Sequence, residues 1–339
     1  MVKVAIWNLG VVGKSAAPVI HAHPDMELVG CFTRSDDKKG KDIGVLCDRG
    51  PFGVLASGDA DAVLALKPDC VLYVPLFPDV DDMVRILESG SNIVSTAYFI
   101  NGRKFGPEGH ARIAAAAQKG GTTIYGTGVN PGFANILGLV ASSACSEVSR
   151  ITVLESVDAT NYASPGTWEA MGIGQEPGTP GIAEFISQST PSFHETVEMM
   201  ADALHVELDD KRFDVEFATA TQDVDLGYMK IGKGRISCLR ASWTGWVRGQ
   251  CVIDLKIAWK LGYHNSPDWP IEHGYVVEIE GTPNVRCKFE PIGASMFDPG
   301  LVTAMPAVHA IPLVCAAAPG IVTADQLPMI TARNCVGPR

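Results

Sequence analysis

Residues 2–20 read VKVAIWNLGVVGKSAAPVI, and this stretch predicts a strand, a tight turn and a helix. Between the strand and the helix, Gly10 and Gly13 occupy two of the three glycine positions of a dinucleotide-binding turn. Asn8 occupies the first of these positions. Because asparagine tolerates the left-handed conformation that the first position needs, we expect the turn to form.

The predicted turn suits a pyrophosphate. Gly10 lets the backbone approach the phosphates closely, and Gly13 lets the helix pack on the sheet. The N-terminus of the helix supplies free N–H groups and a partial positive charge. The alternative is a purely structural turn between strand and helix. We predict that a cofactor contacts Asn8, Leu9, Gly10, Val11, Val12 and Gly13.

The end of the second strand indicates which dinucleotide binds. An NAD site usually places Asp or Glu there to hold the ribose 2′-hydroxyl. Here the strand ends in Thr33, Arg34 and Ser35, with two lysines following at 38 and 39. A guanidinium and two hydroxyls suit a 2′-phosphate, so we predict NADP. If Arg34 is only a solvated loop residue, NAD can serve as well.

The 339-residue chain is long enough for about two domains. Up to about residue 148, short β-branched runs alternate with helical segments, which predicts a doubly wound parallel sheet. Ligands of such sheets bind at the carboxyl ends of the strands. We expect strands at 3–7, 27–32, 53–56, 70–74, 92–95 and 122–125, with helices such as 80–88 and 108–119 between them.

Residues 149–299 have a different pattern, with long strand-like segments that predict an α+β domain with a largely antiparallel, open sheet. One face of that sheet is then free to close over a cofactor or to pair with a second subunit. A small, apolar final helix near 301–316 should return with the segment 300–339 to the first domain. The expected strands are 151–160, 213–219, 235–247, 250–258 and 275–280, with helices at 181–188 and 192–204.

Composition excludes several classes of protein. The net charge of −11 argues against a nucleic-acid or anionic-membrane partner, and no apolar run reaches the roughly 18 residues of a membrane span. The nine cysteines form no CxxC pair, so we expect reduced, buried thiols in a cytoplasmic protein without a signal peptide. We predict no metal site, and we expect His21 and His23 to face solvent.

Three more loops should lie on the same rim of the first sheet. They follow the predicted strands that end at 74, 95 and 125. In the last of them, Asn130 fits a helix N-cap with Pro131 at the first helical position, which is also a sufficient structural explanation. The functional alternative is a loop that holds the nicotinamide carboxamide. The predicted cofactor contacts from these loops are Pro75, Leu76, Thr96, Ala97, Asn130, Pro131, Gly132 and Phe133.

Three motifs resemble a known superfamily: SNIVSTAY at 91–98, YGTGVNPGFANILG at 125–138 and LVTAMPAVHAIPLVCAAAPGI at 301–321. Across nearly its full length the chain resembles the dihydrodipicolinate reductase-like superfamily. Within it, the chain is most similar to 2,4-diaminopentanoate dehydrogenase and the native amine dehydrogenases. The resemblance implies a homodimer, an N-terminal Rossmann domain, and hydride transfer between a nicotinamide and a C–N centre.

The chain also departs from part of that superfamily. True dihydrodipicolinate reductases carry a His-His pair and a Lys before a Gly-Thr anion-binding turn, whereas this chain reads SVDATNYASPGTWEAMG at 156–172. The turn remains but the basic residues are missing, so we expect an apolar pocket instead of a dicarboxylate site. The predicted substrate side consists of Tyr98, Asn161, Tyr162, Trp168, Met171 and Thr303.

The resemblance implies oxidation of an amine to a carbonyl and ammonia, or reductive amination in reverse. The iminium formed by hydride removal needs a nearby negative charge and a base. By that resemblance Glu108 is the catalytic candidate, as base or as electrostatic stabiliser. A glutamate there also suits the first turn of a helix. Two alternatives stay open: reduction of a ring imine or carbonyl, and a non-catalytic NADP sensor.

Overall fold

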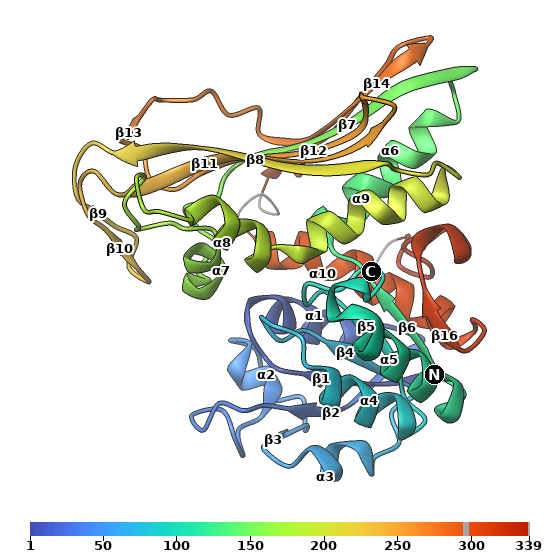
Figure 1. Ribbon diagram of the computed structural model, residues 1–339. Helices are drawn as coiled ribbons and strands as arrows, with labels where there is room; N and C mark the ends of the chain where they lie inside the picture. Colours follow the sequence, from blue (N-terminus) through green and yellow to red (C-terminus); the bar gives the residue numbers. More distant parts are fainter. Residues whose placement is uncertain (294–297, 338–339) are drawn as a thin grey trace. The chain divides into compact units, whose positions relative to one another are not determined.

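The computed structural model describes residues 1–293 and 298–337. The chain divides into two compact units, each with its own sheet (Figure 1). Unit 1 comprises Met1–Gly132 and Asp298–Arg339, and unit 2 comprises Phe133–Phe297.

The sheet of unit 1 is parallel throughout, with the order β16-β6-β5-β4-β1-β2-β3. The order runs outward from β1 in both directions, as expected of a doubly wound sheet. The strands are β1 (Val2–Trp7), β2 (Met26–Phe32), β3 (Ala56–Ser57), β4 (Cys70–Tyr73), β5 (Asn92–Ser95), β6 (Thr123–Gly126) and β16 (Gly320–Val322).

Helices cover both faces of this sheet, which explains why its central strands consist mostly of buried, apolar residues. In β1, Val4 and Ile6 face one core cluster, which includes side chains of α1 and α10, while Ala5 and Trp7 face a second cluster with α4 and α5. The helices of unit 1 are α1 (Val11–Ala22), α2 (Ile43–Leu46), α3 (Ala60–Leu64), α4 (Val80–Glu88), α5 (Gly106–Gly120) and α10 (Pro299–Cys315). Short 3₁₀ turns lie at Arg103–Phe105 and Ala324–Gln326.

The C-terminal segment completes unit 1. Helix α10 packs on α1 and β5, and β16 adds an edge strand beside β6. The buried positions of α10 include Ala304, Ala307 and Ala310, whose small side chains allow close approach to neighbouring elements.

Unit 2 contains a mixed sheet with the order β13-β8-β11-β12-β7-β14-β15. Only the β12–β7 pair is parallel among the strand pairs of this sheet, and the others are antiparallel. The predicted fold class is therefore confirmed. The strands are β7 (Glu147–Asp158), β8 (Asp210–Ala220), β11 (Ile236–Val247), β12 (Gln250–Lys260), β13 (Asn265–Ser266), β14 (Gly274–Thr282) and β15 (Val285–Phe289), and a separate ribbon pairs β9 (Val224–Asp225) with β10 (Lys230–Ile231).

Helices α6 (Ala134–Ser142) and α9 (Pro191–Ala203) pack on one face of the unit 2 sheet (Figure 1). Phe193 of α9 stacks on Trp243 of β11 at a centroid distance of 4.2 Å. Gly138 of α6 lies so close to β7 that a Cβ there would meet Ile151 and Val153 at 3.3 Å. The helices of unit 2 are α6 (Ala134–Ser142), α7 (Pro165–Ala170), α8 (Ile182–Ser189) and α9 (Pro191–Ala203).

The boundary between the units falls after Gly132, whereas the sequence led us to place it after residue 148. The difference is helix α6, which contacts β7, β14 and α9. Its largely apolar sequence, ANILGLVAS, gives no sign of which sheet it covers.

The structure tests two further expectations, the burial of the cysteine thiols and the absence of a membrane-spanning helix. All nine cysteines are free, and Cys31 and Cys70 are buried, but Cys287 is exposed because it lies on the edge strand β15. The expectation that the thiols are buried is therefore wrong for Cys287, and five others are only partly buried: Cys47, Cys145, Cys251, Cys315 and Cys335. Within residues 1–293 and 298–337, no helix has the length and apolar character needed to cross a bilayer.

Candidate active site

The turn after β1 adopts the backbone expected from the sequence. Asn8 has a φ of 74°, the left-handed conformation, and its N–H donates to the carbonyl of Phe32 at 2.8 Å. Gly10 then serves as the N-cap of α1, which begins at Val11. Asparagine thus adopts the left-handed conformation that this position of the turn usually reserves for glycine.

The two glycines of the turn differ in their surroundings. A Cβ on Gly13 would lie 2.7 Å from the carbonyl oxygen of Asn8 and 3.3 Å from Val74, so this glycine is needed for packing within the protein. A Cβ on Gly10 would meet no atom within 4 Å. Gly10 is exposed at the N-terminus of α1, so the protein alone does not explain a glycine there, whereas a closely approaching phosphate does.

The end of β2 carries the predicted ribose contacts. Arg34 pairs with Asp82 at 2.6 Å and lies over the ring of Phe32 at 5.5 Å. Thr33 is buried, and its Oγ1 accepts the N–H of Ser35 at 3.2 Å. The Arg34 side chain is more than half exposed, so its guanidinium can turn toward a ligand.

A carboxylate lies close to these groups. The hydroxyl of Ser35 donates to Asp37, and this hydrogen bond lowers the pKa of the Asp37 carboxyl. Its negative charge opposes a 2′-phosphate, whereas Arg34 favours one.

Lys38 has a contact that the sequence analysis did not find. Its Nζ donates to the carbonyl oxygen of Leu9 at 2.9 Å, which places an ammonium group at the turn before α1. The sequence shows this lysine only as one of several charges after β2. The contact forms only because the loop after β2 folds back toward the turn before α1.

The loops after β4 and β5 meet through two aromatic rings. Phe77 is exposed and stacks on Tyr98 with centroids 6.0 Å apart. Tyr98 has a φ of 35°, a conformation that is strained for a bulky residue and that clusters at functional sites. Of the predicted contacts here, Pro75 and Ala97 are buried, Leu76 is exposed and Thr96 is partly buried.

The loop after β6 does not begin a helix where we expected. Pro131 has a ψ of 144° and Gly132 a φ of 137°, so neither is helical, and α6 begins only at Ala134 with Phe133 as its N-cap. The prediction that Asn130 caps the helix is therefore wrong. The physical reason is Gly132, whose positive φ turns the chain. A Cβ on this residue would lie only 2.9 Å from Thr127 Oγ1, so the turn requires glycine.

The carboxyl end of β6 holds two buried hydroxyls. Tyr125 and Thr127 lie near each other, and their hydroxyls have no further partner among the described residues. Burial raises the pKa of Tyr125 to about 12. Buried hydroxyls without full satisfaction at a strand end are suited to a polar ligand. Together with Gly10, Lys38 and Arg34, they fit a dinucleotide along the carboxyl ends of the strands.

The predicted substrate residues of unit 2 follow the end of β7. Tyr162 lies edge-on to Trp168 at a centroid distance of 5.8 Å, and the indole N–H of Trp168 donates to the carbonyl of Tyr162 at 2.8 Å. Trp168 and Met171 are almost fully buried, and Asn161 is exposed in the turn. In unit 1, the predicted residue Thr303 lies on α10, and its hydroxyl donates to the carbonyl of Pro299 at 2.9 Å.

Glu108 lies in the first turn of α5 and is exposed. Its charge acts on Arg112 one turn further along the helix, which itself pairs with Asp81 at 2.5 Å. This environment fits the structural role of an acidic residue at a helix N-terminus.

A second carboxylate, Glu155, was missed by the sequence analysis. It lies on β7 and is only 7% exposed. The hydroxyl of Tyr275 donates to its Oε1 at 3.3 Å, and the neighbouring charge of Glu155, after burial, contributes to the raised pKa values of Tyr275 and Tyr162. Its only sequence signal is an acidic residue where the alternation of β7 requires an inward side chain.

The two histidines near the end of α1 differ. His21 is exposed and stacks on Phe52 with centroids 4.1 Å apart. His23 is only 7% exposed, so the expectation that it faces solvent is wrong. It caps the C-terminus of α1, where the chain turns inward toward β2.

The parallel sheet, the turn before α1 and the mixed sheet of unit 2 define the class of two-unit dehydrogenases with a Rossmann-type cofactor unit. The family model of the 2,4-diaminopentanoate dehydrogenase C-terminal domain matches residues 134–335, more than half of the chain. The chain therefore belongs to the 2,4-diaminopentanoate dehydrogenase family.

Individual relatives agree with this assignment. The chain is 29% identical to an amine dehydrogenase of Streptomyces virginiae, with 99% of each chain covered. It is 25% identical to the 2,4-diaminopentanoate dehydrogenase of Acetoanaerobium sticklandii, covering 97% of this chain and 94% of that one. The structure of an amine dehydrogenase from Mycobacterium smegmatis shares the fold, with a TM-score of 0.82, 20% identity and 98% of each chain covered.

Proposed function

We propose that this protein is an NAD(P)-dependent amine dehydrogenase. It oxidises an amine with NAD(P)⁺ and water to a carbonyl compound, ammonia, NAD(P)H and a proton, and it performs reductive amination in the reverse direction. The observation that carries the proposal is the left-handed turn at Asn8 with an open Gly10, in a chain related over nearly its full length to an amine dehydrogenase.

The chain's own residues bind and orient the cofactor. The N-terminus of α1 and the open backbone at Gly10 receive the pyrophosphate, and the Lys38 ammonium adds positive charge beside them. Arg34 and Ser35 contact the adenosine ribose, and Arg34 favours NADP while NAD can serve as well. The loop after β6 borders the nicotinamide. The bound nicotinamide supplies the hydride chemistry.

A carboxylate must stabilise the positively charged iminium and receive protons. We assign this part to Glu108, which is exposed and available to a ligand. Glu155 is the alternative, because a buried carboxylate attracts an ammonium more strongly than an exposed one. Separate substitutions distinguish the two assignments.

The substrate side is apolar. Tyr162, Trp168 and Met171 form an aromatic and aliphatic group after β7, without the basic residues that a dicarboxylate needs. Asn161 of unit 2, and Tyr98 and Thr303 of unit 1, stay predicted substrate contacts. The substrate class is therefore a simple amine with an apolar substituent.

We further propose a homodimer in a reducing, cytoplasmic compartment. The sheet face of unit 2 opposite α6 and α9 presents partly buried side chains such as Leu154 and Lys256, which suits a second copy of the chain. The nine free cysteines support the compartment. Sedimentation should give a dimer mass for the wild type and a monomer for Leu154→Glu. A monomeric wild type would contradict the dimer.

The function is tested by incubating the protein with NADP⁺ or NAD⁺ and a panel of amines while following the absorbance of the reduced cofactor. We expect turnover with amines, and in the reverse direction a strict requirement for free ammonia. Reduction of ring imines or carbonyls without ammonia would favour a reductase. Cofactor binding without turnover of any amine, aldehyde or ketone would favour a sensor.

A further inference from the structure

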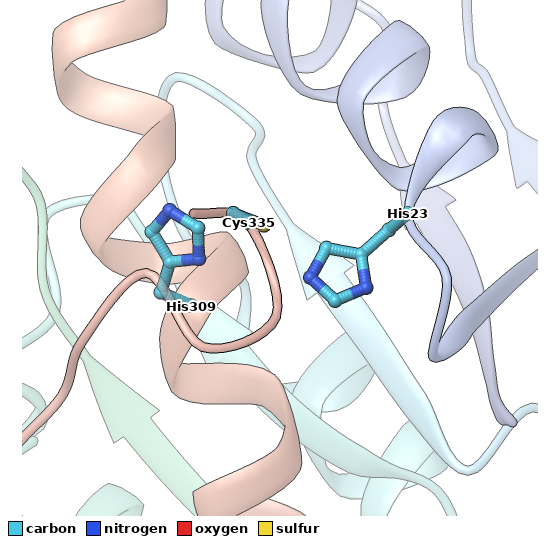
Figure 2. Close-up of side chains that lie close together, drawn as sticks. All are labelled: His23, His309 and Cys335. Atoms are coloured by element: carbon cyan, nitrogen blue, oxygen red, sulfur yellow. The ribbon is translucent and has the colours of Figure 1, made fainter. Parts of the chain in front are cut away.

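Three potential metal ligands from distant parts of the sequence meet in unit 1. His23, His309 and Cys335 each offer a ligand atom, and these atoms lie within 4.8 Å of one another. Figure 2 shows the two imidazole rings facing a common space with Cys335 beside it. We propose that this cluster is a structural binding site for a divalent transition-metal ion of the zinc class.

The fold holds each ligand in place independently. His23 caps α1, with its N–H donating to the carbonyl of Ile20 at 3.2 Å, and α10, which carries His309, packs on α1. The C-terminal tail is anchored next to Cys335, because the side chain of Asn334 donates to Asp25 Oδ2 at 2.5 Å. The approach of the three side chains is therefore a consequence of packing and of a separate hydrogen bond.

Space and additional polar groups are present beside the cluster. A cavity of about 260 Å³ is lined by both histidines and by the polar residues Asp25, Thr331, Arg333 and Asn334. This volume accommodates an ion and a water molecule. A tetrahedral site with two imidazoles and one thiolate thus has room for a water or a carboxylate oxygen as its fourth ligand.

The ligand types select the ion. Imidazole nitrogen and thiolate sulfur suit Zn²⁺ and other late first-row ions, whereas Mg²⁺ and Ca²⁺ prefer oxygen ligands. On binding, the thiol of Cys335 loses its proton to solvent and the sulfur coordinates as thiolate. The ligand atoms lie within 4.8 Å of one another, so a small contraction brings them to tetrahedral spacing around one ion.

One contact provides a specific signature of binding. In the structure, the N–H of Asp25 donates to Nδ1 of His23 at 3.1 Å. If the ion binds Nδ1, it takes the lone pair that accepts the amide hydrogen of Asp25. If the ion binds Nε2, the neutral ring must carry its proton on Nδ1, which then cannot accept. In both cases the Asp25 amide loses its acceptor.

The position of the site indicates its role. His23 follows the last residue of α1, whereas the cofactor turn precedes the first, and a 12-residue helix is about 18 Å long. The ion therefore lies away from the proposed chemistry. It ties the C-terminal tail to α1 and α10, and it should stabilise unit 1 without taking part in the reaction.

The test uses the full chain with Zn²⁺ and with Co²⁺ as a spectroscopic substitute. We expect about one equivalent of Zn²⁺ per chain, a higher melting temperature with Zn²⁺ than with Mg²⁺, and a thiolate-to-cobalt absorption band. Cys335→Ser should abolish that band and weaken Zn²⁺ binding by more than the roughly 10–100-fold that loss of an outer-sphere partner causes. The matched control is Cys287→Ser, which removes an exposed thiol on β15.

A second comparison tests the histidines. His23→Gln should lose Zn²⁺ binding, whereas His21→Gln on the same helix should retain it. In NMR spectra of the wild type, Zn²⁺ should shift the Asp25 amide signal. Wild-type protein that binds no Zn²⁺ at micromolar concentrations, or Cys335→Ser that binds Zn²⁺ as tightly as Cys287→Ser, would overturn the proposal.

Discussion

The Nζ of Lys38 donates to the carbonyl oxygen of Leu9 at 2.9 Å and so joins the loop after β2 to the turn before α1. In the proposed binding mode, the ammonium group lies where the dinucleotide brings its negative charges. The contact supports the turn, and by the proposal Lys38 also supplies positive charge to the ligand.

Lys38→Met should weaken binding of either dinucleotide by about tenfold or more, because a hydrogen bond from a charged donor contributes about 1.5–3 kcal/mol. Isothermal titration calorimetry measures the affinity directly. Lys39→Met is the matched control, since Lys39 is exposed and pairs with Asp36 at 2.5 Å. Equal affinities of the two variants would remove Lys38 from the cofactor site.

Gly10→Ala and Gly13→Ala separate ligand approach from packing. Gly13→Ala should lower the free energy of unfolding by about 1–3 kcal/mol, because its Cβ would overlap the backbone of Asn8. Gly10→Ala meets no protein atom, so it should leave stability unchanged and reduce cofactor affinity. Chemical denaturation and calorimetry on both variants check the pair. A Gly10→Ala protein with normal affinity would indicate that the turn is only structural.

Glu108→Gln and Glu155→Gln distinguish the two carboxylates. The variant that removes the reacting carboxylate should lower kcat for amine oxidation by about 10²–10⁴-fold and leave cofactor affinity nearly intact. We expect this result for Glu108. A large loss only in Glu155→Gln would transfer the role to the buried residue. Circular dichroism of each variant must match the wild type, because Glu155 also accepts the hydroxyl of Tyr275.

Arg34 and Asp82 together should set the preference for NADP over NAD. Arg34→Ala should reduce the preference, measured as the ratio of kcat/KM values, by about tenfold, because it removes a charge-assisted contact to the 2′-phosphate. Asp82→Asn should raise the preference, since it releases the guanidinium from its 2.6 Å ion pair. If neither change alters the ratio, Arg34 is a solvated loop residue.

His194 predicts a dependence of stability on pH. Burial, followed by the charge of Lys211, lowers its pKa, while Glu198 acts in the opposite direction. The unfolded state therefore binds the proton more readily, and the stabilisation present above the ordinary histidine pKa of about 6.5 is lost as pH falls below it.

His194→Gln should make the free energy of unfolding less dependent on pH between about 7 and 5, as measured by urea denaturation. The substituted amide can keep the contact with Ser187, which lies 2.9 Å from Nε2 of His194. Above about pH 7.5, where His194 is neutral in the folded and the unfolded state, the free energies of unfolding of the two proteins should differ by an amount that does not depend on pH. An unchanged slope below pH 7 would show that His194 is not the group responsible.

Local sequence determined most of the secondary structure. The apolar run before Asn8, the two glycines after it and the alternation of short runs with helical segments fix a parallel sheet, because a strand buried on both faces must be apolar throughout. The helix 80–88 and the strand 92–95 occur at their predicted bounds. The left-handed Asn8 follows equally from residue type.

Only the tertiary structure decided what distant residues do together. Glu155 is one acidic residue among many until β7 and β14 pair and place it against Tyr275. His23, His309 and Cys335 are spread over more than 300 positions, and no local pattern announces their approach. Likewise, the late start of α6 depends on the turn at Gly132. Periodicity and turn chemistry act over a few residues, whereas a site depends on which strands pair and which helices pack.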